Sequence, residues 1–283
     1  MTEVVEPREG IGRRGTGVAR LPPPRVVVIG NLTLDDVVLP TGVTRMGAAG
    51  GNTIYAALGA RMWEPRVGVV TRRGEDFPLD HLATLRTLGI GTDGVVDIDG
   101  PTVRNWVIYE EDGRRTWVFR TPPGRSEEVA VHPDDLPSGW LLADPAPVVH
   151  VAAMPLEAAE RLVEHLRGAE RPTTITLDTQ EDWGRDVSDR VLALAAKVHA
   201  FLPSREELAT LAGATELADG LDALAGLPTP VVVVKMGAEG CVVRERGDGV
   251  TYTEVGVSPG PVVDVTGAGD AFCGGFAAGL AAG

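Results

Sequence analysis

The sequence has few cysteines, no long apolar run and a minority of basic residues, and each shortage excludes a class of protein. Its cysteines, Cys241 and Cys273, lie far apart without a CxxC spacing, so neither a disulfide framework nor a thiolate metal site is predicted, and a reducing cytoplasm fits best. No stretch approaches the ~20 uninterrupted apolar residues of a membrane-spanning helix, which predicts a soluble protein without a membrane partner. The tryptophans are scattered and indicate packing rather than a stacking platform.

Several common site patterns are also missing. No GxGxxG follows the first apolar run, which ends at Gly30, so a dinucleotide-binding dehydrogenase is disfavoured. A P-loop kinase is disfavoured because the GxxxxGK pattern followed by Ser or Thr is absent. The histidines show neither HxH nor HExxH spacing and are not predicted metal ligands.

The charge balance is strongly acidic, with 26 Lys and Arg against 40 Asp and Glu and a formal net charge of -14. This disfavours nonspecific nucleic-acid binding but not ATP binding, because a local cluster of N–H donors and metal ions reverses the field. Residues 1–24 carry arginines among Gly and Pro without a signal-like apolar run, and predict a disordered leader. Residues 25–283 are long and apolar enough for one large domain.

Short runs rich in Val and Ile recur along this domain and are typical of buried, mostly parallel strands. They lie at 25–29, 66–70, 148–152, 173–177, 198–202 and 231–235. Helical patterns alternate with them at 52–62, 79–88, 156–167, 187–196 and 205–211. The alternation predicts an α/β fold with a doubly wound, mostly parallel central sheet flanked by helices. Two further runs, 102–109 and 115–120, predict an antiparallel hairpin around Glu111-Asp112-Gly113, either as an edge extension or as a flap near the ligand crevice.

The most informative segment is Asp264-Val265-Thr266-Gly267-Ala268-Gly269-Asp270, which leads into the apolar stretch 271–280. It predicts a glycine-rich turn opening a helix, where unpaired backbone N–H groups beside the positive end of the dipole bind an anion. We therefore expect a phosphate site at Gly267, Ala268 and Gly269. Asp270 would repel a ground-state phosphate and is interpreted as a general base that takes a proton from an attacking hydroxyl. The alternative is an ordinary helix start, where Gly and Asp are favoured for capping alone.

The run DVTGAGDAFCGGFAAGL resembles the C-terminal signature of the pfkB, or ribokinase-like, carbohydrate kinases. Gly47-Ala48-Ala49-Gly50-Gly51-Asn52 resembles the N-terminal glycine-rich signature of that family, and the segments 30–35, 73–76 and 202–207 fall in the family's order. The resemblance implies a ribokinase-like fold with a reduced lid hairpin and ATP-dependent phosphorylation of a hydroxyl group on a small sugar or polyol. Relatives usually continue beyond the last helix, so we expect the C-terminal end to be trimmed or altered.

The resemblance also implies the acceptor residues. Asp35 follows the first strand and is the expected anchor for sugar hydroxyls, with its neighbour Asp36 as the rival assignment. Asn52 offers a donor and an acceptor to a hydroxyl and would also cap the following helix. Close backbone approach to the acceptor is expected at Gly47, Gly50 and Gly51.

For the metal ions, the resemblance points to three residues. Glu207 occupies the family's position for organising Mg²⁺, often through water, in a motif that normally begins with Asn but here begins with Ser204. Asp264 and Thr266 fall where some relatives build a monovalent-cation site, and such oxygen ligands suit K⁺.

The nucleotide is expected near Ser204 and the stretch from Lys235 through Gly237 to Gly240. Many relatives have Thr where this chain has Lys235. The lysine either contacts phosphate or points to solvent.

The acceptor class is left open between sugars, polyols and nucleosides. The interval between Asp35 and Gly47 is short, so a rudimentary lid is expected, and together with Ser204 it resembles the branch that contains myo-inositol kinases. The 102–120 hairpin would supply the remaining cover, with Arg104, Asn105 and Trp106 either touching the acceptor or only packing. A nucleoside kinase and a non-catalytic sugar- or nucleotide-binding regulator are the alternatives. Lid strands often pair between subunits in relatives, which allows a homodimer.

Overall fold

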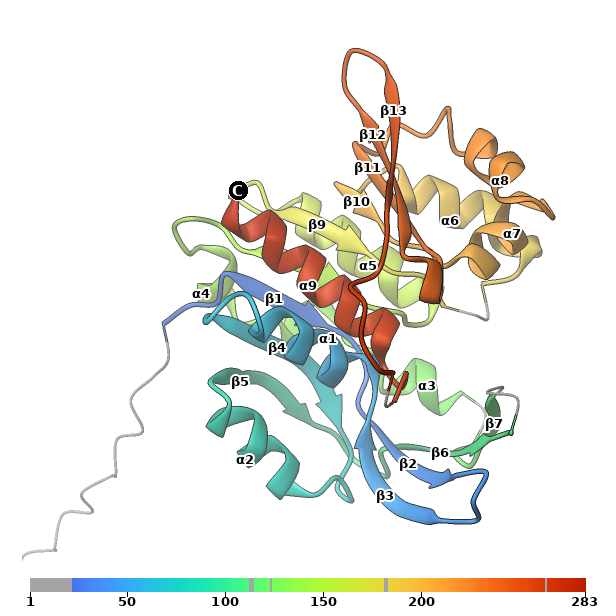
Figure 1. The fold of residues 1–283 in the computed structure, drawn as a ribbon. Coiled ribbons are helices and arrows are strands. Elements are labelled where there is room, and N and C mark those ends of the chain that lie inside the picture. The colour runs from blue at the N-terminus through green and yellow to red at the C-terminus, as the bar shows by residue number, and fades with distance from the viewer. Residues whose placement is uncertain (1–21, 112–114, 123, 181–182, 263) are drawn as a thin grey trace, which may run out of the picture.

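The computed structural model describes residues 22–283 apart from 112–114, 123, 181–182 and 263. The described residues form a central sheet of nine strands and a second sheet of four (Figure 1). The central strands, in spatial order, are β13 (Val250–Val255), β12 (Cys241–Arg246), β11 (Val231–Lys235), β10 (Ala200–Phe201), β9 (Thr174–Leu177), β8 (Val148–Val151), β1 (Val26–Ile29), β4 (Val67–Arg73) and β5 (Ile90–Asp97). Strands β11 to β5 pair in parallel, and β12 and β13 add an antiparallel edge.

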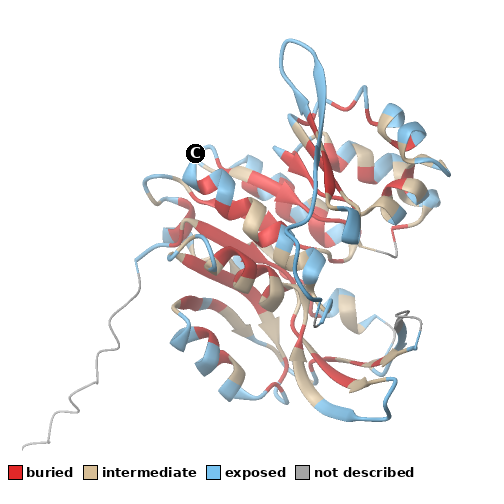
Figure 2. Cartoon of the chain, in the orientation of Figure 1, coloured by how far each residue is buried: buried red, intermediate tan, exposed pale blue. Residues whose placement is uncertain are grey.

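Helices cover both faces of the parallel strands, and this explains why those strands are apolar on both sides. One face carries α1 (Asn52–Arg61), α2 (Leu79–Thr87) and α9 (Ala268–Ala282). The other carries α5 (Leu156–Arg167), α6 (Ser188–Ala195), α7 (Arg205–Ala212) and α8 (Leu217–Ala223). Short turns of helix complete the chain: α3 (Arg125–Glu128), α4 (Ser138–Leu141), η1 (Pro133–Asp135), η2 (Arg185–Val187) and η3 (Gly237–Glu239). Figure 2 shows the buried residues concentrated in the central strands between the two helix layers.

The predicted fold class is confirmed, and each predicted strand and helix is present with its ends within a few residues. The sequence patterns do not predict β5, β12 or β13. Every residue of β13 is exposed, so its sequence has no buried face from which a strand period could be recognised. No helix in the described part of the chain is long and apolar enough to cross a membrane.

The predicted hairpin lies in the second sheet, which we call the lid sheet. In spatial order its strands are β3 (Thr44–Gly50), β2 (Thr33–Val38), β6 (Val103–Tyr109) and β7 (Arg115–Phe119). The edge-extension alternative is therefore wrong, because β6 pairs with β2 and not with the central sheet. The lid is also larger than a hairpin: a tight turn at 39–42 lets the short interval after Asp35 form two strands. Asp112 and Gly113 of the predicted turn lie outside the described residues.

The strand order places a ligand crevice beside β1. This strand has β4 on one side and β8 on the other, so the chain winds away from it in both directions. Ligands of open α/β sheets bind at such a switch point, outside the carboxyl ends of the strands. The lid sheet follows directly from the carboxyl end of β1, and the N-terminal end of α9 points toward it (Figure 1). Of the predicted leader, residues 1–21 lie outside the described residues, whereas Pro24 is buried.

Candidate active site

The Asn52 side chain joins the loop after β1 to the loop after β8 at the switch point. Its Oδ1 accepts a hydrogen bond from the backbone N–H of Asn31, after β1, at 2.8 Å, and its Nδ2 donates to the carbonyl oxygen of Ala153, after β8, at 2.5 Å. The N-cap of α1 is Gly51, without a side-chain capping bond, so the capping role expected of Asn52 is wrong. Gly51 has φ 101°, and a Cβ there would lie 2.2 Å from the Asn31 carbonyl oxygen. The amide of Asn52 therefore shapes the crevice whether or not it also contacts an acceptor.

Asp35 and Asp36 project from opposite faces of β2 and have different partners. Asp36 is fully buried and accepts bonds from Arg104, at 3.0 Å and 3.1 Å, and from Arg120 and the backbone N–H of Gly47. Hydrogen bonding from Arg104 lowers the Asp36 pKa. All these bonds hold the lid strands together. They weaken the alternative that Asp36, rather than Asp35, binds the acceptor.

Asp35 has only neutral partners. Its oxygens accept bonds from Asn105 Nδ2 and Thr33 Oγ1, both at 3.1 Å, and burial raises its pKa. Gly50 leaves room for this carboxylate, because a Cβ on the glycine would lie 1.9 Å from Asp35 Oδ2. The N–H of Gly47 is already used by Asp36. Gly50 is therefore required to make room for the Asp35 carboxylate, whereas Gly47 serves Asp36 through its backbone N–H.

Asp270 lies in the first turn of α9, the helix that packs against α1. The pKa of Tyr55 in α1 is raised by burial and further by the charges of Asp35, Tyr109, Asp264 and Asp270. The charges of both carboxylates therefore act on the same phenol. The Tyr55 ring packs on Gly267, where a Cβ would be 2.1 Å from the ring. The contact between Tyr55 and Gly267 thus joins α1, near the start of the domain, to the loop before α9, near its end.

The loop before α9 has the conformation expected of a glycine turn. Gly267 is the N-cap with φ 67°, a left-handed conformation that favours glycine. The N–H of Ala268 donates to the Val265 carbonyl at 3.1 Å, so it is used within the turn and is not an anion donor in this conformation. The N–H of Gly269 lies in the first turn, where the helix itself provides no acceptor. It is the better candidate for phosphate contact.

Lys235 lies beneath this loop in a buried polar cluster. Its ammonium pairs with Asp178 at 2.6 Å and lies 3.7 Å from the Cys273 sulfur. A Cβ on Gly269 would be 4.0 Å from the same nitrogen. Burial is the largest single influence and opposes the charge of the lysine, but Asp178, Cys273 and Glu207 together outweigh it and the lysine pKa is raised. The solvent-pointing alternative for Lys235 is therefore wrong.

Ser204 and Glu207 form the N-terminal cap of α7. The Ser204 hydroxyl accepts from the Glu207 N–H at 3.1 Å, and Glu207 Oε2 accepts from the Ser204 N–H at 2.6 Å and from Thr179 Oγ1. Burial raises the Glu207 pKa. Within the described residues no group of three or more His, Cys, Asp or Glu could hold a metal. The role of Glu207 in organising Mg²⁺ through water stays a prediction.

The remaining predicted residues form turns at the rim of the same region. Asp264 Oδ1 accepts from the Thr266 N–H at 2.8 Å, and Thr266 Oγ1 bonds with the Tyr109 hydroxyl of the lid sheet. Backbone and side-chain hydrogen bonds from Thr266 lower the Asp264 pKa, and the K⁺ site at these two residues stays a prediction. Gly237 and Gly240, both with positive φ, shape the turn between β11 and β12.

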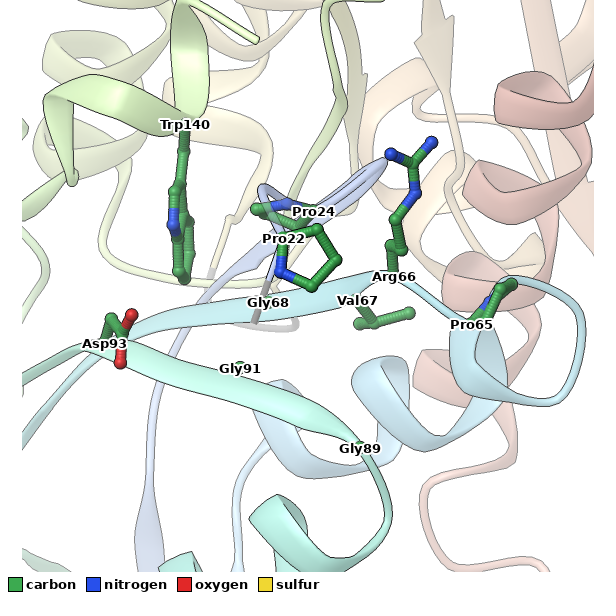
Figure 3. Close-up of a pocket in the computed structure, with 10 residues that line it drawn as sticks. All are labelled: Pro22, Pro24, Pro65, Arg66, Val67, Gly68, Gly89, Gly91, Asp93 and Trp140. Atoms are coloured by element: carbon green, nitrogen blue, oxygen red, sulfur yellow. The ribbon is translucent and has the colours of Figure 1, made fainter. Parts of the chain in front are cut away.

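A shallow pocket on the opposite edge of the central sheet is not part of this site (Figure 3). Its walls come from the amino ends of β1, β4 and β5, together with the Trp140 ring and Pro22 and Pro24. Ligands of such sheets bind at the carboxyl ends, so this pocket carries no functional assignment.

Sequence reasoning missed Tyr55 and Asp178. Tyr55 lies three residues after Asn52, a spacing that places both on one side of a helix, and this signal could have identified it. Asp178 directly follows β9, at a carboxyl strand end, but a single Asp there has no pattern that separates it from a turn residue.

The mostly parallel sheet, the lid sheet beyond the carboxyl end of β1 and the glycine-led start of α9 define an α/β protein with a covered crevice at its switch point. The chain belongs to the pfkB family of carbohydrate kinases, whose model matches residues 26–283. It is a sugar or nucleoside kinase of that family. The family implies ATP with a divalent metal ion.

Similar proteins include kinases with different acceptors. A cytidine kinase from Thermococcus kodakarensis is 29% identical over 258 residues, which cover 91% of this chain and 89% of that protein. A fructokinase from Klebsiella pneumoniae is 30% identical over 274 residues, covering 91% and 85%. Among solved structures, a Vibrio cholerae fructokinase with fructose, ADP and potassium ion bound has a TM-score of 0.73 at 22% identity, covering 92% of this chain and 84% of that one.

Proposed function

We propose that this kinase transfers the γ-phosphoryl group of ATP to a hydroxyl of a small polyhydroxylated acceptor bound between the lid sheet and α9, with Asp270 as the general base. The observation that carries the proposal is the packing of the Tyr55 ring of α1 on Gly267 at the start of α9. There the charges of both Asp35 and Asp270 add to burial in raising the Tyr55 pKa. One carboxylate would hold the acceptor while the other receives its proton. The acceptor oxygen forms the new bond to phosphorus, the bond to the bridging oxygen breaks, ADP leaves and the proton passes to Asp270.

The donor would lie over the start of α9, with its terminal phosphate on the N–H of Gly269. Losing one such donor typically costs about 3 kcal/mol of barrier. Lys235 lies close enough to Gly269 to add a positive charge at this point. Mg²⁺, when bound through water at Glu207, would neutralise phosphate charge, and K⁺ at Asp264 and Thr266 would support the same loop.

The test is ADP release by the purified full chain with ATP, Mg²⁺ and a panel of myo-inositol, fructose, ribose and cytidine, with and without K⁺. The Asp270→Asn variant should keep ATP affinity and lose about 10² to 10⁴ in turnover, the usual contribution of a general base. Asp248→Asn, on an exposed turn, is the matched control. Near-normal turnover of Asp270→Asn would exclude the base assignment.

The identity of the acceptor is a separate part of the proposal. myo-Inositol is the acceptor to which the short interval after Asp35 and the presence of Ser204 point. A nucleoside is supported by the cytidine kinase, which aligns with nearly all of this chain. ADP release in response to one acceptor only would decide between them. Binding of ATP or sugar without turnover across the panel would instead support the non-catalytic regulator.

A further inference from the structure

One row of side chains runs across three strands of the lid sheet. Asp35 of β2 pairs with Asn105 of β6, and Asn105 pairs in turn with Phe119 of β7. Directly paired residues project from the same face of a sheet, and the bond from Asn105 Nδ2 to Asp35 Oδ1 at 3.1 Å agrees with this. A carboxylate, an amide and a phenyl ring therefore stand side by side on one face.

This face is the one turned toward α9. Tyr109 lies four residues after Asn105 on the same face of β6, and its hydroxyl bonds with Thr266 in the loop before α9. Arg104 projects from the opposite face, where it holds Asp36. Of the three β6 residues predicted as acceptor contacts, only Asn105 thus shares a face with Asp35.

The polar end of the row demands hydrogen-bond donors. Asn105 is 3% exposed, and its Oδ1 has no hydrogen-bond partner among the described residues. The orientation of the amide is explained by Asp35, because only the NH₂ group can donate to a carboxylate. A buried acceptor without a partner is costly, and beside it stands a carboxylate that also only accepts when ionised. Neighbouring hydroxyl groups are the ligands that satisfy both.

The other end of the row is aromatic and uncovered. Phe119 is 65% exposed, and Trp117, two residues earlier on the same face, is 39% exposed. Strands lie about 4.8 Å apart, so the phenyl ring stands roughly 10 Å from the Asp35 carboxylate. One ligand would span this distance if its planar ring stacked on Phe119 and Trp117 and its hydroxylated ring bound to Asp35 and Asn105.

We propose that the acceptor is a nucleoside, with its ribose diol on Asp35 and Asn105 and its base stacked on Phe119 and Trp117. This rests on the proposed function and makes Asn105 and Phe119 its specificity residues. With the diol held on the lid sheet, the primary hydroxyl is the one directed to Asp270. Its oxygen forms the bond to the γ-phosphorus, the bond to the β,γ-bridging oxygen breaks, and ADP and a nucleoside monophosphate are released.

The experiment compares kcat/KM for cytidine, ribose, 2′-deoxycytidine and 3′-deoxycytidine in the wild type and in Phe119→Ala, Phe119→Tyr and Asn105→Ala. Stacking of one base is expected to favour cytidine over ribose by about tenfold to a hundredfold. Phe119→Ala should lose that preference because kcat/KM falls far more for cytidine than for ribose, and Phe119→Tyr should retain it. The wild type should reject one of the two deoxycytidines more strongly than the other. Asn105→Ala should lose this discrimination.

Val118→Ala is the matched control, because Val118 is 44% exposed on the same strand but projects from the opposite face. It should match the wild type with every acceptor. Turnover of myo-inositol or fructose but not of cytidine would overturn the nucleoside assignment and leave the kinase function intact. A Phe119→Ala variant that changes the oligomeric state but not the preference for cytidine would also overturn it. Failure of the wild type with every acceptor would overturn the proposed function itself.

Discussion

Gly274 of α9 lies against the carbonyl oxygen of Ala56 in α1, so closely that a Cβ on the glycine would be 1.8 Å from that oxygen. Gly59 of α1 approaches the carbonyl oxygen of Ala271 in the same way, at 2.1 Å. The two backbones are thus in direct contact, with no side chain between them. Because α1 begins at Asn52 and α9 begins beside Asp270, this contact sets the spacing between the acceptor side and the phosphate side of the site.

Gly274→Ala should therefore push the two helices apart. Overpacking a tight site costs about 1–3 kcal/mol, and ADP release should fall because Asp270 moves relative to the acceptor. Gly279→Ala, in the same helix with nothing within 4 Å of its added Cβ, is the matched control. It should raise the free energy of unfolding by up to about 1 kcal/mol through helix propensity. Urea unfolding of both variants measures the difference, and equal stabilities would contradict the close contact.

Asp35→Asn and Asp36→Asn should separate binding from stability. Burial already disfavours the Asp35 charge, and the Thr33 hydroxyl can accept from a new amide, so we expect a stability change within about 1 kcal/mol. Acceptor kcat/KM should fall sharply. Asp36→Asn removes the charge that pairs with Arg104 and Arg120. Both arginines are partly exposed, so the loss should be about 1–3 kcal/mol. Denaturation and steady-state kinetics on both variants measure these effects, and the reverse pattern would exchange the two roles.

Lys235 and Asp178 should be strongly coupled in stability. Lys235→Met leaves a carboxylate that is 5% exposed without its cation, and Asp178→Asn leaves the ammonium unpaired. Each single change should cost about 3–5 kcal/mol, whereas the double variant should recover most of the loss because no buried charge remains. Urea unfolding of the four proteins gives the coupling energy, and additive losses would argue against the pair.

The double variant also tests the proposed phosphate contact of Lys235. Its charge balance is preserved, so a weaker affinity for ATP measured by calorimetry would come from the missing ammonium and not from unfolding. Unchanged ATP affinity would assign Lys235 a structural role only.

His150 should make the fold sensitive to acid. Burial lowers its pKa from 6.5 to about 4, and its Nδ1 pairs with Thr176 Oγ1 at 2.9 Å. The folded pKa is below the unfolded one, so this contribution to stability is complete above pH 6.5 and is lost as the pH falls toward 4. The difference corresponds to about 3 kcal/mol.

Urea unfolding at pH 7.5 and pH 4.5 measures this loss. His150→Leu should lose less stability than the wild type across the interval, because no imidazole remains to be protonated. His165→Gln, at an exposed position in α5, should behave as the wild type does. A similar acid loss in His150→Leu and the wild type would assign the sensitivity to other groups.

Local patterns determined the alternation of strands and helices. The buried parallel strands were predictable because two covered faces require continuous Val and Ile. The strand β13 was not predictable, since every one of its residues is exposed. The strands β2 and β3 were not predicted either, because their residues mix charged, polar and apolar side chains without a continuous apolar run.

By itself the sequence determined the family, the fold class and the identity of Asp270 and Asp35 as candidate site residues, because glycine turns and carboxylates at strand and helix ends are local signals. Only the tertiary structure decided that Asp36 serves the lid arginines, that Lys235 is paired with Asp178, and that Asn105 and Phe119 share a row with Asp35. These facts depend on which strands pair and in which register. The pairing of β2 with β6 and the contact of Lys235 with Asp178 join segments that lie far apart in the chain, so no short stretch of sequence encodes them.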